Sequence, residues 1–194
     1  MKSLACVFLF FCTTSLRAQD KSLPYFEIPL DPDGFTAGTV ASRMIDGLGF
    51  RYYWATEGLR SEDLSHKPSK DARTSEETIA HIYEMSILIL NATTKTVNVP
   101  GQDKKLPFAE MRKETLNNFK NASVNLRSAT DQQMKEFKFI YKDNKQLVEY
   151  PFWNMINGPI EDCVWHVGQL VSFRRSSGNP FNSKAEVFTG KLEK

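Results

Sequence analysis

The stretch EDCVWHVGQLVSFRRSSGNP, residues 161–180, contains the clearest helix signal in the chain. Its adjacent arginines, Arg174 and Arg175, would lie in the last turn of such a helix, where basic side chains interact favourably with the helix dipole. Gly178 then follows as a C-terminal cap and Pro180 as a stop. We therefore predict a long helix that begins after one of the preceding prolines and ends just before Gly178.

A polar stripe runs along one side of this helix. With a step of about 100° per residue, Asp162, His166 and Gln169 fall on the same side. Three valines occupy the opposite side: Val164, Val167 and Val171. A helix that is apolar over most of its circumference is typically buried. The polar stripe then needs partners, because an unsatisfied buried polar group costs about 1–3 kcal/mol.

Three earlier segments have the pattern of amphipathic helices. Residues 36–59 carry apolar side chains at every fourth position, and residues 107–126 begin with a proline suited to a first helical turn. Residues 74–94 open with Thr74 and Glu77, which have the spacing of a capping box. We predict one helix in each of these segments.

Between residues 136 and 150 the helical spacing of apolar residues gives way to an alternating pattern, which predicts a small β-hairpin. Four helices joined by connections of very different lengths then indicate an all-α fold, a four-helix bundle with the hairpin between its third and fourth helices. The chain divides accordingly into a leader, an extended segment, the bundle and an irregular tail, at residues 1–18, 19–35, 36–180 and 181–194. Bundles of this kind place metal and ligand sites among inward-facing side chains of different helices.

Two glycines, Gly47 and Gly49, lie inside the first predicted helix. Each weakens a helix by roughly 1 kcal/mol relative to alanine. Their presence is explained if a neighbouring segment packs close to the helix at this level.

The first 18 residues have the features of a secretory signal peptide. Lys2 is a short positive start, residues 4–11 are apolar, and Ala18 is a suitable cleavage residue. The apolar run is too short to span a membrane. We therefore expect an exported protein, periplasmic or secreted, with no stable membrane insertion after cleavage.

Removal of this leader changes the charge and the cysteine content. Lys2 and Arg17 leave with it, so the 25 basic residues fall to 23 and equal the 23 acidic residues. A nearly neutral chain does not indicate a nucleic-acid-binding protein, and no nucleic-acid partner is expected. Of the three cysteines only Cys163 remains, so no disulfide within the chain is expected. We interpret Cys163 as a small buried hydrophobic residue and not as a nucleophile.

His81 is the natural partner for the polar stripe of the last helix, because it lies on an apolar face of the helix predicted at 74–94. If the two helices face each other, His81 meets Asp162 and His166. Two histidines and one carboxylate would bind a divalent transition metal on one side and leave positions open for water or substrate. Gln169 would then be a hydrogen-bond partner for the second ring nitrogen of a ligating histidine.

The same residues also have a purely structural interpretation. A histidine on an apolar stripe is commonly a hydrogen-bonded core residue, and an aspartate one helical turn before a histidine can simply orient it. From spacing alone, both interpretations of His81, Asp162 and His166 stay open.

Several segments together resemble the DinB/YfiT-like superfamily of bacterial four-helix-bundle proteins. They are TIAHI at 78–82 and HVGQL at 166–170, the latter followed by the two arginines and by GNP at 178–180. The segment DGLGFRYYWATEGL at 46–59 looks like the branch of this family found in exported Bacteroidetes-type proteins. The resemblance covers residues 36–180.

The resemblance implies a divalent-metal site made of three histidines, one on the second helix and two in a His-x-x-x-His pair on the last. His81 and His166 match the first and the last of these, whereas Asp162 stands where the middle histidine is usual. It also implies zinc or nickel as the metal, a small-molecule substrate and a homodimer, since dimers are common among the members. Members are assigned as metal-dependent hydrolases or thiol S-transferases.

Two functional hypotheses follow. The first is an exported hydrolase in which His81, Asp162 and His166 hold the metal and a metal-bound water attacks the substrate; no further catalytic residue is assigned. A thiol S-transferase fits less well, because such enzymes use cytosolic thiols. The alternative is a non-catalytic exported bundle that binds a small ligand or a partner protein and has a degenerate metal site.

Overall fold

The computed structural model describes residues 22–101 and 105–193. The expected signal peptide at 1–18 lies outside these residues. Among the helices that are described, none combines the length and the apolar character needed to cross a membrane.

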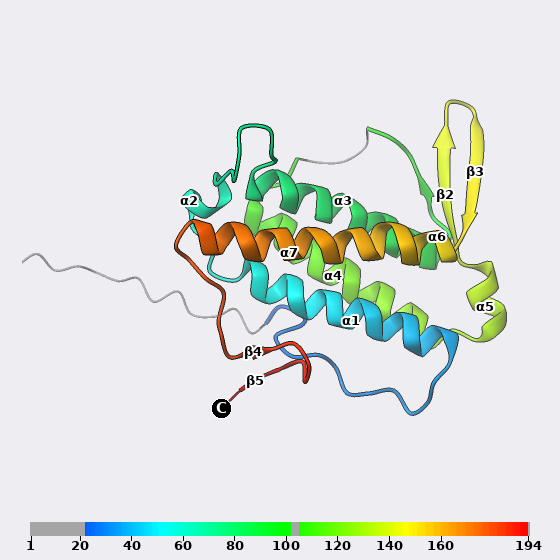
Figure 1. Ribbon diagram of the computed structural model, residues 1–194. Helices are drawn as coiled ribbons and strands as arrows, with labels where there is room; N and C mark the ends of the chain where they lie inside the picture. Colours follow the sequence, from blue (N-terminus) through cyan, green and yellow to red (C-terminus); the bar gives the residue numbers. More distant parts are fainter. Residues whose placement is uncertain (1–21, 102–104, 194) are drawn as a thin grey trace, which may run out of the picture.

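The fold is mainly helical and is dominated by four long helices (Figure 1). These are α1 (Ala37–Thr56), α3 (Ser75–Thr94), α4 (Phe108–Arg127) and α7 (Glu161–Ser176). Helix α4 packs against both α1 and α3, and α7 packs against the same two, so the four helices enclose a common core. Helices α1 and α7 run in one direction and α3 and α4 in the other. All four correspond to predicted segments.

The start of α3 shows how the sequence specifies these helices. The Thr74 hydroxyl accepts a hydrogen bond from the Glu77 N–H at 3.1 Å, and the Glu77 carboxylate accepts one from the Thr74 N–H at 2.8 Å. The predicted capping box is therefore present, and it satisfies two N–H groups that the helix itself leaves unpaired. Thr36 and Thr39 cap α1 in the same way.

The predicted hairpin is formed by β2 (Lys138–Asp143) and β3 (Gln146–Pro151), which pair antiparallel. A third strand, β1 (Val97–Asn98), pairs parallel with β2 and makes a small mixed sheet. The sequence did not predict β1, because two residues are too few to show a period. The hairpin projects from one end of the helices (Figure 1).

Several short elements join the long helices: α2 (Ser61–Leu64), α5 (Asp131–Glu136), α6 (Trp153–Met155) and the π-helical segment η1 (Ile156–Ile160). The segment at 181–194 differs from the irregular tail that was predicted, since it contains the paired strands β4 (Ala185–Glu186) and β5 (Lys191–Leu192). This segment is held in place by residues that are distant in the sequence. The Ile28 N–H donates a hydrogen bond to the Gly190 carbonyl at 2.8 Å, and local sequence carries no signal for such a contact.

The segment before α1 is fastened to the helices. The Tyr25 side chain is buried, and its hydroxyl donates a hydrogen bond to Asp46 of α1 at 3.0 Å. The Tyr25 ring lies against Gly49, and any β-carbon at that position would overlap the ring. A neighbouring segment therefore packs close to α1 at Gly49, as the sequence predicted. At Gly47 a β-carbon would meet only the flexible side chain of Arg51.

Helix α7 is less buried than its apolar composition predicted. Val167 is buried as expected, but Val164 is 44 % exposed and Trp165 is 73 % exposed. The prediction of a fully buried helix was therefore wrong: α7 packs against α1 and α3, and Val164 and Trp165 lie on a part of its surface that these helices leave open. Arg174 is buried instead, and its Nη1 donates to three backbone carbonyls at the C-terminal end of α1.

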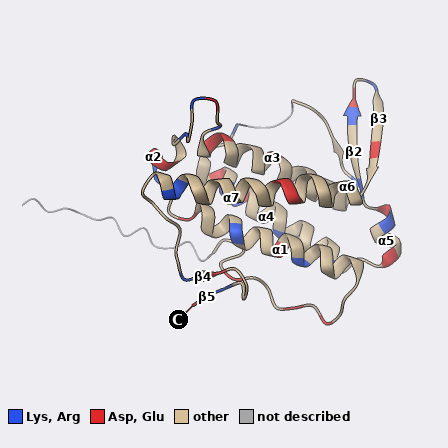
Figure 2. Ribbon diagram, viewed as in Figure 1, with Lys and Arg blue, Asp and Glu red and all other residues tan. Residues whose placement is uncertain are grey.

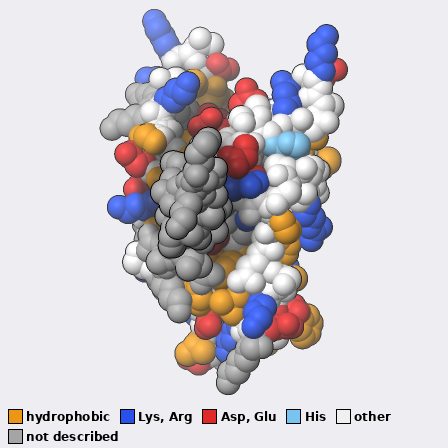
Figure 3. Space-filling view, turned by 90° about the vertical axis from the view of Figure 1, so that its left-hand side faces the viewer, with side chains coloured by type: hydrophobic (Ala, Val, Ile, Leu, Met, Phe, Trp, Pro, Cys, Tyr) orange, Lys and Arg blue, Asp and Glu red, His pale blue; other side chains and the backbone are white. Residues whose placement is uncertain are grey.

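Charged residues of both signs are distributed over the long helices (Figure 2). On the end of the molecule shown in Figure 3, acidic and basic side chains lie next to one another and apolar patches are exposed between them.

Candidate metal centre

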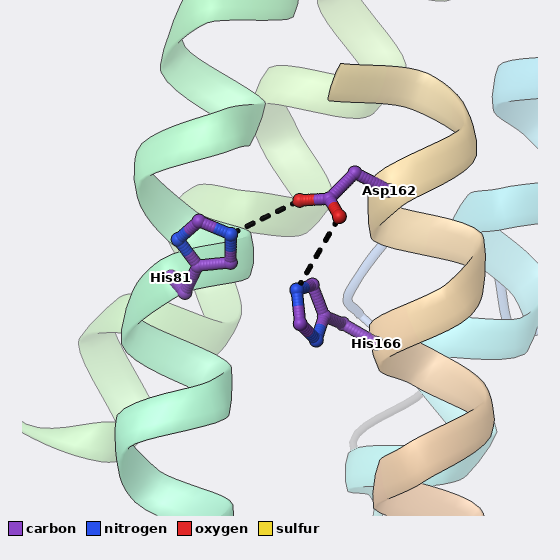
Figure 4. A group of neighbouring side chains, drawn as sticks. All are labelled: His81, Asp162 and His166. Atoms are coloured by element: carbon purple, nitrogen blue, oxygen red, sulfur yellow. Dashed lines mark hydrogen bonds and ion pairs between the residues drawn. The ribbon is translucent and has the colours of Figure 1, made fainter. Parts of the chain in front are cut away.

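His81, Asp162 and His166 converge in the gap between α3 and α7 (Figure 4). His81 projects from α3, while Asp162 and His166 project from consecutive turns of α7. Their side chains are 23 %, 37 % and 15 % exposed, respectively. The cluster therefore lies near the surface, where solvent or a small molecule can reach it.

The Asp162 carboxylate occupies the centre of the cluster. Its Oδ2 lies 3.0 Å from His81 Nε2, and its Oδ1 lies 3.5 Å from His166 Nε2. The two imidazole rings meet edge to face with their centroids 4.8 Å apart. The structure thus brings together the three residues that the sequence proposed as metal ligands, with ring nitrogens and carboxylate oxygens directed toward one another (Figure 4).

The donor set fits a divalent transition metal. One ligand atom from each residue can be chosen so that all three lie within 4.8 Å of one another. Ligands held tetrahedrally at about 2.0–2.2 Å from one ion lie about 3.3–3.6 Å apart, so the most distant pair must approach by roughly 1–1.5 Å, which side-chain rotation can supply. Two imidazole nitrogens and one carboxylate oxygen are donors that zinc and nickel accept.

Gln169 takes the position expected from the sequence. His166 Nδ1 donates a hydrogen bond to Gln169 Oε1 at 2.8 Å. A proton held on Nδ1 leaves the lone pair of Nε2 directed at the cluster, which is the tautomer that a metal requires.

Glu84 is a neighbour of the cluster that sequence reasoning missed. Its Oε2 lies 4.0 Å from His81 Nδ1, one turn further along α3. This separation is longer than a direct hydrogen bond. The signal was available in the sequence, because residues three apart on a helix are neighbours.

A shallow hollow of about 430 Å³ adjoins Asp162. Its walls include Met85 of α3, Asn157 and Pro159 of η1, and Glu161, Asp162 and Trp165 of α7. The segment η1 ends directly before Glu161, and Gly158 within it departs from helical dihedral angles and is followed by Pro159. The chain is therefore kinked here, and the kink sets the direction in which α7 begins.

Cys163 is adjacent to Asp162 in the sequence but does not belong to the cluster. Its side chain is fully buried. Burial, together with the nearby negative charge of Asp162, raises the pKa of the thiol well above its usual range. Because the thiolate is the reactive form, Cys163 is not a nucleophile at neutral pH.

In comparisons with known proteins, no family model matched the chain, and neither a curated protein nor a solved structure matched it.

Proposed function

We propose that the protein is an exported hydrolase that depends on a divalent metal held by His81, Asp162 and His166. The observation that carries this proposal is the convergence of three ligand-type side chains from two helices. The local resemblance to the DinB-like superfamily supports it, because two of the three residues match that family's ligand pattern. Because of the same resemblance, we propose that the four long helices form a DinB-like bundle.

A bound divalent metal lowers the pKa of a water molecule and polarises a substrate oxygen. The residues of the chain set the conditions for this chemistry. Two neutral imidazoles and one carboxylate carry a single negative charge, so a dication held by them keeps a net positive charge. All three side chains are partly exposed, and Asp162 lines the neighbouring hollow, so a substrate in that hollow would approach the metal from the side of Asp162.

The side chains around the ligands have supporting roles. Gln169 fixes the ring orientation and tautomer of His166 through the hydrogen bond at Nδ1. Glu84 places a negative charge near His81 Nδ1 and favours a proton there, which frees Nε2 for the metal.

One observation favours the alternative of a non-catalytic bundle. His81 Nε2–H can donate directly to Asp162 Oδ2 at 3.0 Å, so the polar groups are satisfied without a metal. In that case the cluster would be a hydrogen-bonded link between α3 and α7, and the protein would bind a small ligand or a partner protein without turnover.

A hydrolysis assay distinguishes the metal-dependent hydrolase from the non-catalytic bundle. The exported protein is stripped with a chelator, reloaded with zinc or nickel, and tested on a panel of chromogenic esters, amides and phosphate esters. We expect activity in the reloaded wild type and in His66→Ala, which alters the histidine outside the cluster, but none in His166→Ala. Equal hydrolysis by the stripped protein, the reloaded protein and His166→Ala would contradict the proposal.

A further inference from the structure

Two hollows meet at Pro159, next to the candidate metal centre. The first is the hollow that adjoins Asp162. The second, of about 220 Å³, is lined by Phe139 and Tyr150 of the hairpin together with Asn154, Met155 and Pro159. Both include Pro159, so they lie next to each other around this residue, one toward Asp162 and the other toward the hairpin; we call the pair the Pro159 hollow. Its position makes it the natural place for a substrate of the metal centre.

The hairpin end of the Pro159 hollow is aromatic. The rings of Phe139 and Tyr150 stack with their centroids 6.1 Å apart and an angle of 29° between their planes. Phe139 also stacks on Tyr141. These three residues share one face of the hairpin, because Phe139 pairs with Tyr150 and Tyr141 follows two positions after Phe139. A flat apolar group fits against stacked rings of this kind.

The end near the metal centre combines an indole ring with negative charge. Trp165 is 73 % exposed, which leaves most of a large apolar side chain in contact with solvent. Glu161 lies one helical turn before Trp165, on the same side of α7. In the described part of the chain the Glu161 carboxylate has no hydrogen-bond or ion-pair partner, and the residues that line the two hollows include no lysine or arginine.

An indole face beside a carboxylate is a combination that binds alkylammonium groups, because both attract a cation. We propose that the substrate of the metal centre is an organic amine with a flat apolar group. Its ammonium group binds between Glu161 and Trp165, and its apolar group lies toward Phe139 and Tyr150. This inference rests on the proposed function for the identity of the site, and its binding component can be measured without a metal.

The test uses three probes of matched shape: phenethylamine, phenethyl alcohol and 3-phenylpropionate. Their binding is followed by the NMR shift of the Trp165 indole N–H, assigned with Trp165→Phe. It is measured in the wild type and in His166→Ala, which removes a metal ligand. We expect phenethylamine to bind about tenfold more tightly than the alcohol in both proteins, and the carboxylate to bind most weakly.

Two matched variants identify the source of this preference. Glu161→Gln should bind the amine and the alcohol about equally, because the favourable charge is lost. Glu110→Gln removes an exposed carboxylate from α4, outside the hollow, and should keep the preference. The inference is overturned if the alcohol or the carboxylate binds as tightly as the amine in the wild type, if Glu161→Gln keeps the preference, or if no probe shifts the Trp165 signal.

The outcomes separate this inference from the proposed function. Amine preference in a protein that binds no metal would support the Pro159 hollow as an amine site and contradict the hydrolase. Metal-dependent hydrolysis without amine preference would support the hydrolase and contradict the amine substrate.

Discussion

Asp162 Oδ2 lies 3.0 Å from His81 Nε2, so one hydrogen bond joins residues that are 81 positions apart and links α3 to α7. The second oxygen of the same carboxylate faces His166 at 3.5 Å. Asp162 is therefore placed to act as the middle ligand of a metal, at the position where the resemblance to the DinB-like superfamily implies a histidine. The following predictions depend on this arrangement and on the contacts that hold α7 in place.

Replacing Asp162 tests whether its position is a ligand position. Asp162→His supplies a nitrogen donor on the same turn of α7, and we expect it to retain metal binding. Asp162→Ala supplies none and should weaken zinc affinity by more than about 100-fold, judged against the 10–100-fold typical for losing a hydrogen-bond partner of a ligand. Competition with a zinc chelator measures both. Equal affinities of the two variants would show that residue 162 does not bind metal.

Gln169 should influence the metal only through His166. Gln169→Leu removes the acceptor for His166 Nδ1–H, and we expect metal affinity to fall by about 10–100-fold. Gln169→Glu keeps an acceptor at the same place and serves as the control. Nitrogen chemical shifts of the His166 ring should report a change of tautomer in the leucine variant. An unchanged tautomer and affinity would argue against this role.

Asp63 of α2 should control the acid stability of the fold. Its side chain is fully buried and accepts hydrogen bonds from Arg60, Ser177 and Asn179. Burial alone would raise the pKa of Asp63, but these hydrogen bonds outweigh burial and hold the pKa well below its ordinary value of 3.8. Because the folded-state pKa is depressed, the stabilisation is fully present above about pH 4 and is lost as the pH falls further.

The measurement is chemical denaturation at pH 7 and pH 3. Asp63→Asn should lower the free energy of unfolding by about 3–5 kcal/mol at pH 7, because it breaks a buried charged network. Between pH 7 and pH 3, the free energy of unfolding should also fall less in Asp63→Asn than in the wild type. Asp71→Asn, a change in the exposed loop before α3, should leave both quantities close to wild type. A full-sized acid loss in Asp63→Asn would contradict the assignment.

Gly47 and Gly49 of α1 should respond in opposite directions to replacement by alanine. Gly49→Ala overlaps the Tyr25 ring and should destabilise the fold by about 1–3 kcal/mol through overpacking. Gly47→Ala meets only the movable Arg51 side chain and should be neutral or stabilising by up to about 1 kcal/mol, since alanine is the better helix former. Thermal unfolding of the two variants checks this. Equal destabilisation would mean that Tyr25 does not pack on Gly49.

Local sequence signals predicted the long helices and the hairpin well. The capping box of Thr74 and Glu77 and the alternation between 136 and 150 depend on residues close in sequence, and both features appear where expected. The strand β1, the docking of Tyr25 on Gly49 and the order of the tail depend on contacts between distant residues. No local period could reveal them.

The members of the candidate site could also be predicted from local spacing, but their surroundings could not. The four-residue spacing of Asp162 and His166 places both on one side of α7, and His81 was the remaining histidine on an apolar face. The exposure of Trp165 was not predictable, because periodicity shows which residues share a face but not whether another helix covers that face. The Pro159 hollow depends on that exposure and on the hairpin together.

Whether His81, Asp162 and His166 hold a metal is tested by the metal content of the purified protein after equilibration with zinc or nickel. Elemental analysis is made on the wild type, His81→Ala, His166→Ala and, as the matched control, His66→Ala. We expect one metal ion per chain in the wild type and in His66→Ala, and close to none in His81→Ala and His166→Ala. Near-zero metal in all four proteins, or equal metal in all four, would contradict the proposed metal site.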